Sequence, residues 1–305
     1  MSSYANILSS MAAMKEGKTD PNYQKYLTEK LDRGEPNMVV DSVTELMSND
    51  QLLQSESIRI VDFGCFTGSV INRVHLSLTE SSKKKVNLFG FDYDATIVKK
   101  AALMWPQISF HQYYITETPA KIEPFQIGIL SNVLHEVYSL KTNNKKEAEK
   151  LVTRSLKNIQ NMIDIGGFLV ILDGILPDNP EKEVDINFLQ DNFYSKFIQF
   201  CKSEYCVKIP CKEVGDRTIQ TTLGGLAAFL VKFRYLETTF WEQESSQIYN
   251  YFTKEKFEEV LTNCGFTVKK QDFFEVPKIQ EKLKILDPTI QMPFKNTLII
   301  AKRIN

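Results

Sequence analysis

The sequence predicts an α/β fold in which helices cover both faces of a mostly parallel sheet. Residues 58–61 (Ile-Arg-Ile-Val) are typical of a buried strand, and a turn with glycines at 64 and 68 leads into a helical segment at 69–78. Short apolar strands then alternate with amphipathic helical segments as far as residue 173. This alternation is the pattern of a doubly wound sheet, in which helices connect parallel strands.

Seven segments have strand character. The predicted strands, in chain order, are 58–61, 86–91, 108–115, 125–131, 168–173, 266–276 and 296–303. The predicted helices outside the region 177–250 are 21–32, 38–47, 69–78, 95–104, 145–162 and 253–263. Pro106 ends the fourth of these helices, because the residue before a proline is pushed out of the helical region.

Residues 177–250 interrupt the alternation. Pro177 and Pro180 open a loop, and helical segments rich in aromatic residues follow near 184–202 and 223–236. An insertion after the fifth strand lies at the carboxyl end of the sheet, above the usual ligand crevice. We therefore interpret it as a helical substrate lid. The alternative is an ordinary helical subdomain whose aromatic side chains form its own core.

The composition is that of an ordinary globular chain, with 43% hydrophobic and 25% charged residues among 305. A formal net charge of −1 argues against broad nucleic-acid binding, which depends on a basic field. The five cysteines and three histidines have no metal-ligand spacing. The first residues lack a signal-peptide pattern, and no apolar stretch approaches the ~20 residues of a membrane helix. We expect a soluble, cytoplasmic protein with reduced thiols, no metal and no membrane or nucleic-acid partner.

The turn after the first strand is the strongest candidate for ligand binding. Asp62 closes the strand, and Gly64 and Gly68 let a ligand approach the backbone without a Cβ in the way. A buried strand, a glycine turn and a helix, in that order, present backbone N–H groups to a nucleotide-like ligand. Asp92 ends the second strand, where an acidic residue accepts hydrogen bonds from a ribose. The alternative for Asp92 is a solvated loop carboxylate, and Asp94 is a second candidate for the ribose.

These motifs resemble those of the class I S-adenosylmethionine-dependent methyltransferases. Residues 61–68 (Val-Asp-Phe-Gly-Cys-Phe-Thr-Gly) are similar to the first motif of that family, and 90–94 (Gly-Phe-Asp-Tyr-Asp) to the second. Residues 128–136 and 166–173 are similar to its fourth-strand and fifth-strand motifs.

The resemblance covers most of the chain, namely residues 55–175 and 252–303. The chain departs from the family pattern at two positions. Phe66 stands where the first motif usually has its middle glycine, and Gln126 stands where an aspartate often precedes the fourth strand.

The resemblance implies a Rossmann-like, doubly wound sheet of seven mostly parallel strands. The last two strands of class I methyltransferases form a hairpin, which places one antiparallel strand in the sheet. With the helical insertion between strands five and six, the chain divides into four parts. These are an N-terminal helical cap (1–50), a cofactor-binding Rossmann-like core (51–176), the helical substrate-lid insertion (177–250) and the C-terminal part of the methyltransferase core (251–305).

The cofactor that the resemblance implies is S-adenosyl-L-methionine. In the family arrangement Asp62 holds the glycine turn near the amino-acid end of the cofactor, and Asp92 accepts both ribose hydroxyls. The cofactor-binding residues implied by the matching motifs are Asp62, Gly64, Cys65, Gly68, Asp92, Tyr93, Asn132 and Val133.

His135 and Glu136 follow the fourth strand and are the catalytic candidates. This Val-Leu-His-Glu run, with the later Ile-Leu-Asp-Gly-Ile-Leu-Pro, also resembles the catalytic domain of small-molecule O-methyltransferases, in which the matching histidine is the general base. Carried over, His135 would deprotonate a hydroxyl, and Glu136 or another carboxylate would fix its tautomer. The alternative is that His135 only packs at the strand end, as in many other methyltransferases.

The leading hypothesis is an S-adenosylmethionine-dependent methyltransferase of a small or medium-sized acceptor, with O-methylation slightly favoured over N-methylation. One alternative is an NAD(P)-dependent oxidoreductase, although the glycine turn lacks the third glycine of the dinucleotide fingerprint. Another is a non-catalytic binding module with a degenerate cofactor site, an alternative that Phe66 and Gln126 keep open. The partner expected is a small-molecule acceptor, and a homodimer is compatible with the sequence.

Overall fold

The computed structural model describes residues 35–48, 56–79, 83, 85–118 and 122–304. The predicted N-terminal cap is therefore described only in part, as helix α3 (Glu35–Met47), which matches the helix predicted at 38–47. The helix predicted at 21–32 lies outside the described residues.

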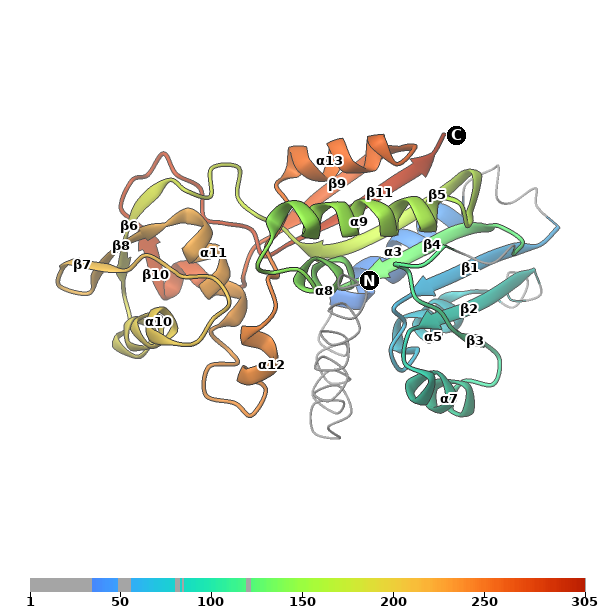
Figure 1. The fold of residues 1–305 in the computed structure, drawn as a ribbon, viewed down its shortest axis with the longest axis horizontal. Coiled ribbons are helices and arrows are strands. Elements are labelled where there is room, and N and C mark those ends of the chain that lie inside the picture. Colours follow the sequence, from blue (N-terminus) through green and yellow to red (C-terminus); the bar gives the residue numbers. More distant parts are fainter. Residues whose placement is uncertain (1–34, 49–55, 80–82, 84, 119–121, 305) are drawn as a thin grey trace.

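The core of the protein is a seven-stranded sheet with the strand order β3-β2-β1-β4-β5-β11-β9 (Figure 1). Its strands are β1 (Ile58–Phe63), β2 (Val86–Asp92), β3 (Ser109–Gln112), β4 (Phe125–Ser131), β5 (Ile163–Gly174), β9 (Phe266–Phe274) and β11 (Asn296–Arg303). β11 runs antiparallel to both of its neighbours, while the pairs from β3 to β5 are parallel. The predicted sheet with one antiparallel strand is confirmed.

Helices cover both faces of this sheet, because its central strands are apolar on both sides. On β4, Ile127 and Ile129 pack with α3 and α5, and Leu130 packs with α8, α9 and α13 on the opposite face. The helices of the core are α5 (Ser69–Ser77), α7 (Ala95–Met104), α8 (Leu134–Ser139), α9 (Lys145–Gln160) and α13 (Lys254–Asn263). The doubly wound arrangement brings the carboxyl ends of β1, β2, β4 and β5 to one edge.

The insertion follows β5 as predicted, but it is not purely helical. It contains β6 (Glu183–Phe188), β7 (Lys212–Gly215) and β8 (Thr218–Thr222) as well as α10 (Asp191–Lys202), α11 (Leu223–Lys232) and α12 (Trp241–Ser245). The prediction of a helix from residue 184 was wrong, because Val184, Ile186 and Phe188 alternate as a strand does and are all buried. Figure 1 shows the insertion as a lobe beside the end of the main sheet.

The link between β9 and β11 also contributes to this lobe. It forms a short 3-10 helix, η1 (Ile279–Glu281), and strand β10 (Leu283–Ile285), which pairs antiparallel with β6. The second sheet therefore has the order β10-β6-β8-β7. The lobe is built from two separate parts of the chain, which the division at residues 177–250 did not anticipate.

Most aromatic side chains of the insertion form the core of the lobe itself. The rings of Phe197 and Phe229 lie 4.9 Å apart, and those of Phe193 and Phe233 lie 5.0 Å apart. Phe188 and Phe200 are buried in the same cluster. Such contacts between aromatic rings stabilise a subdomain, so these side chains have a packing role whatever the lobe covers.

Candidate functional site

The glycine turn after β1 has a left-handed backbone at both of its glycines. Gly64 and Gly68 have φ angles of 72° and 77°, in the region that glycine favours. A Cβ at Gly64 would lie 2.6 Å from Cγ2 of Val133, so this glycine is also required for packing. Phe66, in the place of the middle glycine, itself adopts a φ of 47°. The turn thus has a left-handed conformation at Phe66 although the phenylalanine side chain is large.

Asp92 joins the end of β2 to the glycine turn. Its Oδ2 accepts a hydrogen bond from the backbone N–H of Phe66 at 3.0 Å, and its Oδ1 accepts one from the N–H of Asp94 at 3.0 Å. These two hydrogen bonds fix the Asp92 carboxylate beside the turn. Asp94 has a different role, because its side chain accepts from the N–H of Thr96 and caps α7. Tyr93, between them, is half-buried, and its ring lies 6.1 Å from that of Tyr114.

Asp62 is a buried carboxyl group beside this turn. It is 1% exposed, and its Oδ2 has no hydrogen-bond partner within the described part of the chain. Burial and, second, the charge of Asp92 raise the pKa of Asp62 to about 8, although a backbone hydrogen bond from Ile71 opposes this. Burial and the same two carboxylates raise the pKa of the neighbouring Cys65 thiol. An orphaned buried oxygen in such a place fits a cationic ligand group.

Asn132 and Val133 continue the site at the end of β4. Asn132 has a φ of 58°, and its backbone N–H donates to the carbonyl of Leu172 at 2.7 Å. Its Oδ1 accepts a hydrogen bond from the hydroxyl of Tyr249. Val133 packs against Gly64, so the structure brings the predicted residues of the first and fourth strands together at one edge.

His135 is bound to a carboxylate, but that carboxylate belongs to Asp173 at the end of β5. Nδ1 of His135 lies 2.8 Å from Oδ1 of Asp173, and the backbone N–H of His135 donates to Oδ2 at 3.1 Å. His135 is 5% exposed and Asp173 is completely buried. Because a carboxylate only accepts hydrogen bonds, Nδ1 carries the proton. The sequence left the partner open between Glu136 and another carboxylate, and the carboxylate found at Nδ1 is that of Asp173.

Sequence reasoning missed three other residues of the site. Asp173 lies near the carboxyl end of β5, the strand that pairs with β4. Because His135 follows β4, the pairing of these two strands is the signal that could have identified Asp173. Tyr249 packs on the His135 ring with centroids 4.5 Å apart, and the hydroxyl of Tyr251 donates to Oδ2 of Asp173 at 3.4 Å. Both tyrosines follow α12 in an Ile-Tyr-Asn-Tyr-Phe run that has no motif.

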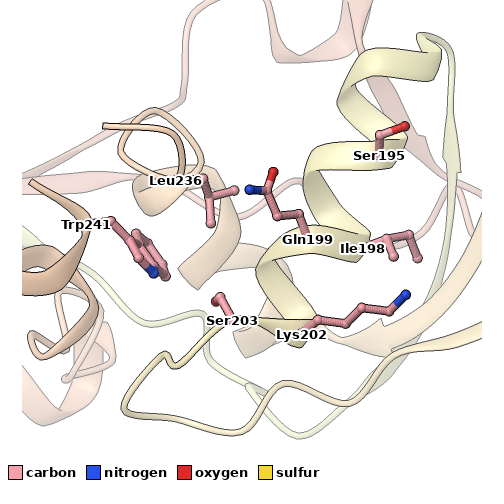
Figure 2. Close-up of a pocket in the computed structure, with 7 residues that line it drawn as sticks. All are labelled: Ser195, Ile198, Gln199, Lys202, Ser203, Leu236 and Trp241. Carbon is pink, nitrogen blue, oxygen red and sulfur yellow. The ribbon is translucent and has the colours of Figure 1, made fainter. Parts of the chain in front are cut away.

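A separate groove of about 510 Å³ lies on the insertion. It is lined by Ser195, Ile198, Gln199, Lys202, Ser203, Leu236 and Trp241. Figure 2 shows Gln199 reaching toward Leu236, while Lys202 and Ile198 point away from Trp241. None of the predicted site residues lines this groove, so it is not the candidate site.

Two further features bear on the class of protein. Among the described residues, no three or more His, Cys, Asp or Glu side chains gather as metal ligands would. The described helices include none with the length and apolar character needed to cross a membrane.

The fold is shared with solved methyltransferase structures. No protein-family model and no curated protein matches the sequence. The N-methyltransferase NodS of Bradyrhizobium japonicum WM9, solved with S-adenosyl-L-homocysteine, is 11% identical, with a TM-score of 0.50 over 97% of this chain and 99% of NodS. A chain from a Haloferax volcanii complex between the Trm112 methyltransferase activator and a proposed methyltransferase is 10% identical, with a TM-score of 0.51 and coverages of 96% and 98%.

A third match is longer than this protein. The CurJ carbon methyltransferase is 15% identical, with a TM-score of 0.49 over 88% of this chain and 54% of CurJ. The chain therefore spans about half the length of that protein. At identities this low, a structural match shows a shared fold and nothing more. The matches to NodS and to the Haloferax volcanii chain, together with the strand order and the single antiparallel strand, show that the chain has the fold of the class I S-adenosylmethionine-dependent methyltransferases.

Proposed function

We propose that the protein transfers the methyl group of S-adenosyl-L-methionine to a hydroxyl group of a small or medium-sized acceptor. The observation that carries the choice of a hydroxyl is the buried pair of His135 and Asp173, beside the glycine turn at the carboxyl edge of the sheet. The fold supports S-adenosyl-L-methionine as the cofactor. The imidazole of His135 supports an acceptor group that must lose a proton.

The side chains at the carboxyl edge of the sheet have the chemical groups that this cofactor needs. The carboxylate of Asp92, held beside the glycine turn at the end of β2, is the type of acceptor that ribose hydroxyls need. Oδ2 of Asp62, which has no partner among the described residues, suits the ammonium of the amino-acid part of the cofactor. Gly64 and Gly68 leave the backbone of the turn open to a ligand. The bound cofactor would supply an electrophilic methyl group on a sulfonium sulfur.

His135 would accept the proton of the acceptor. With the proton on Nδ1 held by Asp173, the lone pair of Nε2 is available, and Nε2 has no hydrogen-bond partner in the described part of the chain. Nε2 would take the proton of the acceptor hydroxyl while its oxygen bonds to the methyl carbon and the carbon–sulfur bond breaks, so that S-adenosylhomocysteine would leave as a neutral thioether. The charge of Asp173 would stabilise the imidazolium that forms on His135. General-base catalysis of this kind contributes roughly 10²- to 10⁴-fold to a rate.

The insertion would cover the acceptor. The chain returns from it past His135 and Asp173, through Tyr249 and Tyr251. Any acceptor that reaches Nε2 therefore lies close to that returning segment. N-methylation is the second candidate for the same site, because a neutral nitrogen nucleophile would need His135 less.

Calorimetric titrations with S-adenosylmethionine, S-adenosylhomocysteine and NADH test this proposal against its alternatives. The proposal predicts micromolar binding of the two adenosyl ligands and no binding of NADH. Binding of NADH alone would support an oxidoreductase. If none of the three bound, the site would be degenerate and the proposal would be wrong.

A further inference from the structure

The chain returns from the insertion to the core through residues 246–252, the return segment. The backbone N–H of Ile248 donates to Oγ of Ser139 on α8 at 2.9 Å. Two residues later, Nδ2 of Asn250 donates to the carbonyl of Ile175, just after β5, at 2.7 Å. The residue between these two anchors is therefore held in place from both sides.

That residue is Tyr249, which lies between two residues of the candidate site. Its hydroxyl donates to Oδ1 of Asn132, and its ring packs on the imidazole of His135 with an interplanar angle of 56°. Its backbone is pressed against β5, since a Cβ at Gly174 would lie 2.2 Å from the Tyr249 carbonyl oxygen. Tyr249 is only 4% exposed, so it cannot change position without moving these neighbours.

The two contacts of Tyr249 reach different halves of the site. Asn132 belongs to the cofactor half, because it precedes Val133, which packs on Gly64 of the glycine turn. His135 belongs to the acceptor half. The hydrogen bond to Oδ1 fixes the orientation of the Asn132 amide, and the packed Tyr249 ring limits rotation of the His135 imidazole about its Cβ–Cγ bond.

We propose that Tyr249 is a positioning residue that couples the cofactor site to the general base. A ligand that contacts Asn132 changes the orientation of the Tyr249 hydroxyl and ring, and the ring passes that change to the His135 imidazole. The coupling is reciprocal, so an acceptor bound at His135 changes the affinity for the cofactor by the same factor. This inference rests on the proposed methyl transfer.

Nitrogen NMR of the histidine side chains measures this coupling without a known acceptor. The protein has three histidines, so the His135 signals can be assigned by comparison with a His135→Gln variant. The spectra are recorded without ligand and with saturating S-adenosylhomocysteine. Tyr249→Phe removes only the hydroxyl and keeps the ring. Tyr205→Phe is the matched control, because the Tyr205 ring packs on those of Phe200 and Trp241 within the insertion.

The ligand should shift the His135 signals in the wild type and in Tyr205→Phe, and the shift should fall by about twofold or more in Tyr249→Phe. The affinity of Tyr249→Phe for the ligand should fall by about two- to tenfold, the effect of losing one hydrogen bond. If Tyr249→Phe does not fold, Asn132→Gly removes the same bond at a left-handed position that glycine tolerates.

An equal His135 shift in the wild type and Tyr249→Phe, with the ligand bound to both, would overturn the coupling and leave the proposed function intact. No binding of S-adenosylhomocysteine to the wild type would contradict the proposed function, and this inference with it. A reduced shift in Tyr205→Phe as well would assign the effect to packing of the insertion and would also overturn the role of Tyr249.

Discussion

The carboxylate of Asp173 contacts His135 twice, through the imidazole Nδ1 at 2.8 Å and through the backbone N–H at 3.1 Å. The N–H of Gly174 and the hydroxyl of Tyr251 donate to the same carboxylate. Four hydrogen bonds fix a completely buried group. The imidazole is therefore oriented by the end of β5 as well as by its own helix, α8.

Asp173→Asn should abolish the function of His135 as a base while the histidine itself remains. An asparagine amide can donate to Nδ1, which would place the imidazole proton on Nε2, where it blocks proton acceptance. We expect the turnover number to fall by ~10²–10⁴, with the affinity for S-adenosylhomocysteine nearly unchanged. Glu136→Gln is the comparison and should stay within a few-fold of the wild type. Equal losses in both variants would contradict the assignment of Asp173.

Asp62 should release a proton when a cationic ligand binds. Burial and the charge of Asp92 raise its pKa to about 8, so the carboxyl is largely protonated at pH 7 in the free protein. An ammonium placed next to it would lower the pKa and expel the proton. Calorimetry at pH 7 in two buffers of different ionisation enthalpy measures that release. Proton release should disappear in Asp62→Asn, and its persistence there would assign the proton to another group.

The same shift predicts a pH dependence of stability. Because the pKa of Asp62 is higher in the folded protein than the ordinary value of 3.8, its contribution to stability is fully present below pH 3.8. That contribution is lost as the pH rises through about 8. The melting temperature of Asp62→Asn should therefore decline less than that of the wild type over this range.

Asp92→Asn should weaken binding of S-adenosylhomocysteine. The amide keeps the shape but loses the charge that ribose hydroxyls would meet, at a cost of ~1–3 kcal/mol in binding free energy. Asp94→Asn is the matched control, since asparagine still caps α7 and Asp94 should not touch the ligand. Titration calorimetry compares the two. If Asp94→Asn weakened binding as much as Asp92→Asn, the ribose contact would be wrongly assigned.

The return segment and α12 should become protected when the site is filled. If the insertion covers the acceptor, ligands should slow amide hydrogen exchange there more than in β6 or β8. Mass spectrometry with S-adenosylhomocysteine and an acceptor measures this for each peptide. Unchanged exchange throughout the insertion would show that it is a separate subdomain and not a lid.

The main sheet could be predicted from sequence because its signals are local. Apolar runs bounded by glycine, such as those ending at Gly64 and Gly174, identify buried strands. The predicted strand at 125–131 matches β4, and the predicted helix at 95–104 matches α7. The insertion was harder, because the alternation of Val184, Ile186 and Phe188 runs directly into the helical pattern of α10.

The positions of the candidate site residues were predictable where a motif fixes the place of a residue in the fold. Asp62, Gly64 and Asp92 meet at one edge because they end or follow neighbouring parallel strands. Asp173 also lies near the end of a strand next to β4, but the sequence alone left the partner of His135 open between Glu136 and another carboxylate. Tyr249 lies much farther along the chain, and only the folded insertion brings it to Asn132.

The central claim is methyl transfer with His135 as the base, and its most direct test is transfer of a labelled methyl group. S-adenosylmethionine with a labelled methyl carbon is incubated with the protein and fractions of small hydroxyl compounds. We predict a labelled product with the wild type and a rate lower by ~10²–10⁴ with His135→Asn, although both bind S-adenosylhomocysteine equally. A His135→Asn variant that transfers label at the wild-type rate would contradict the account.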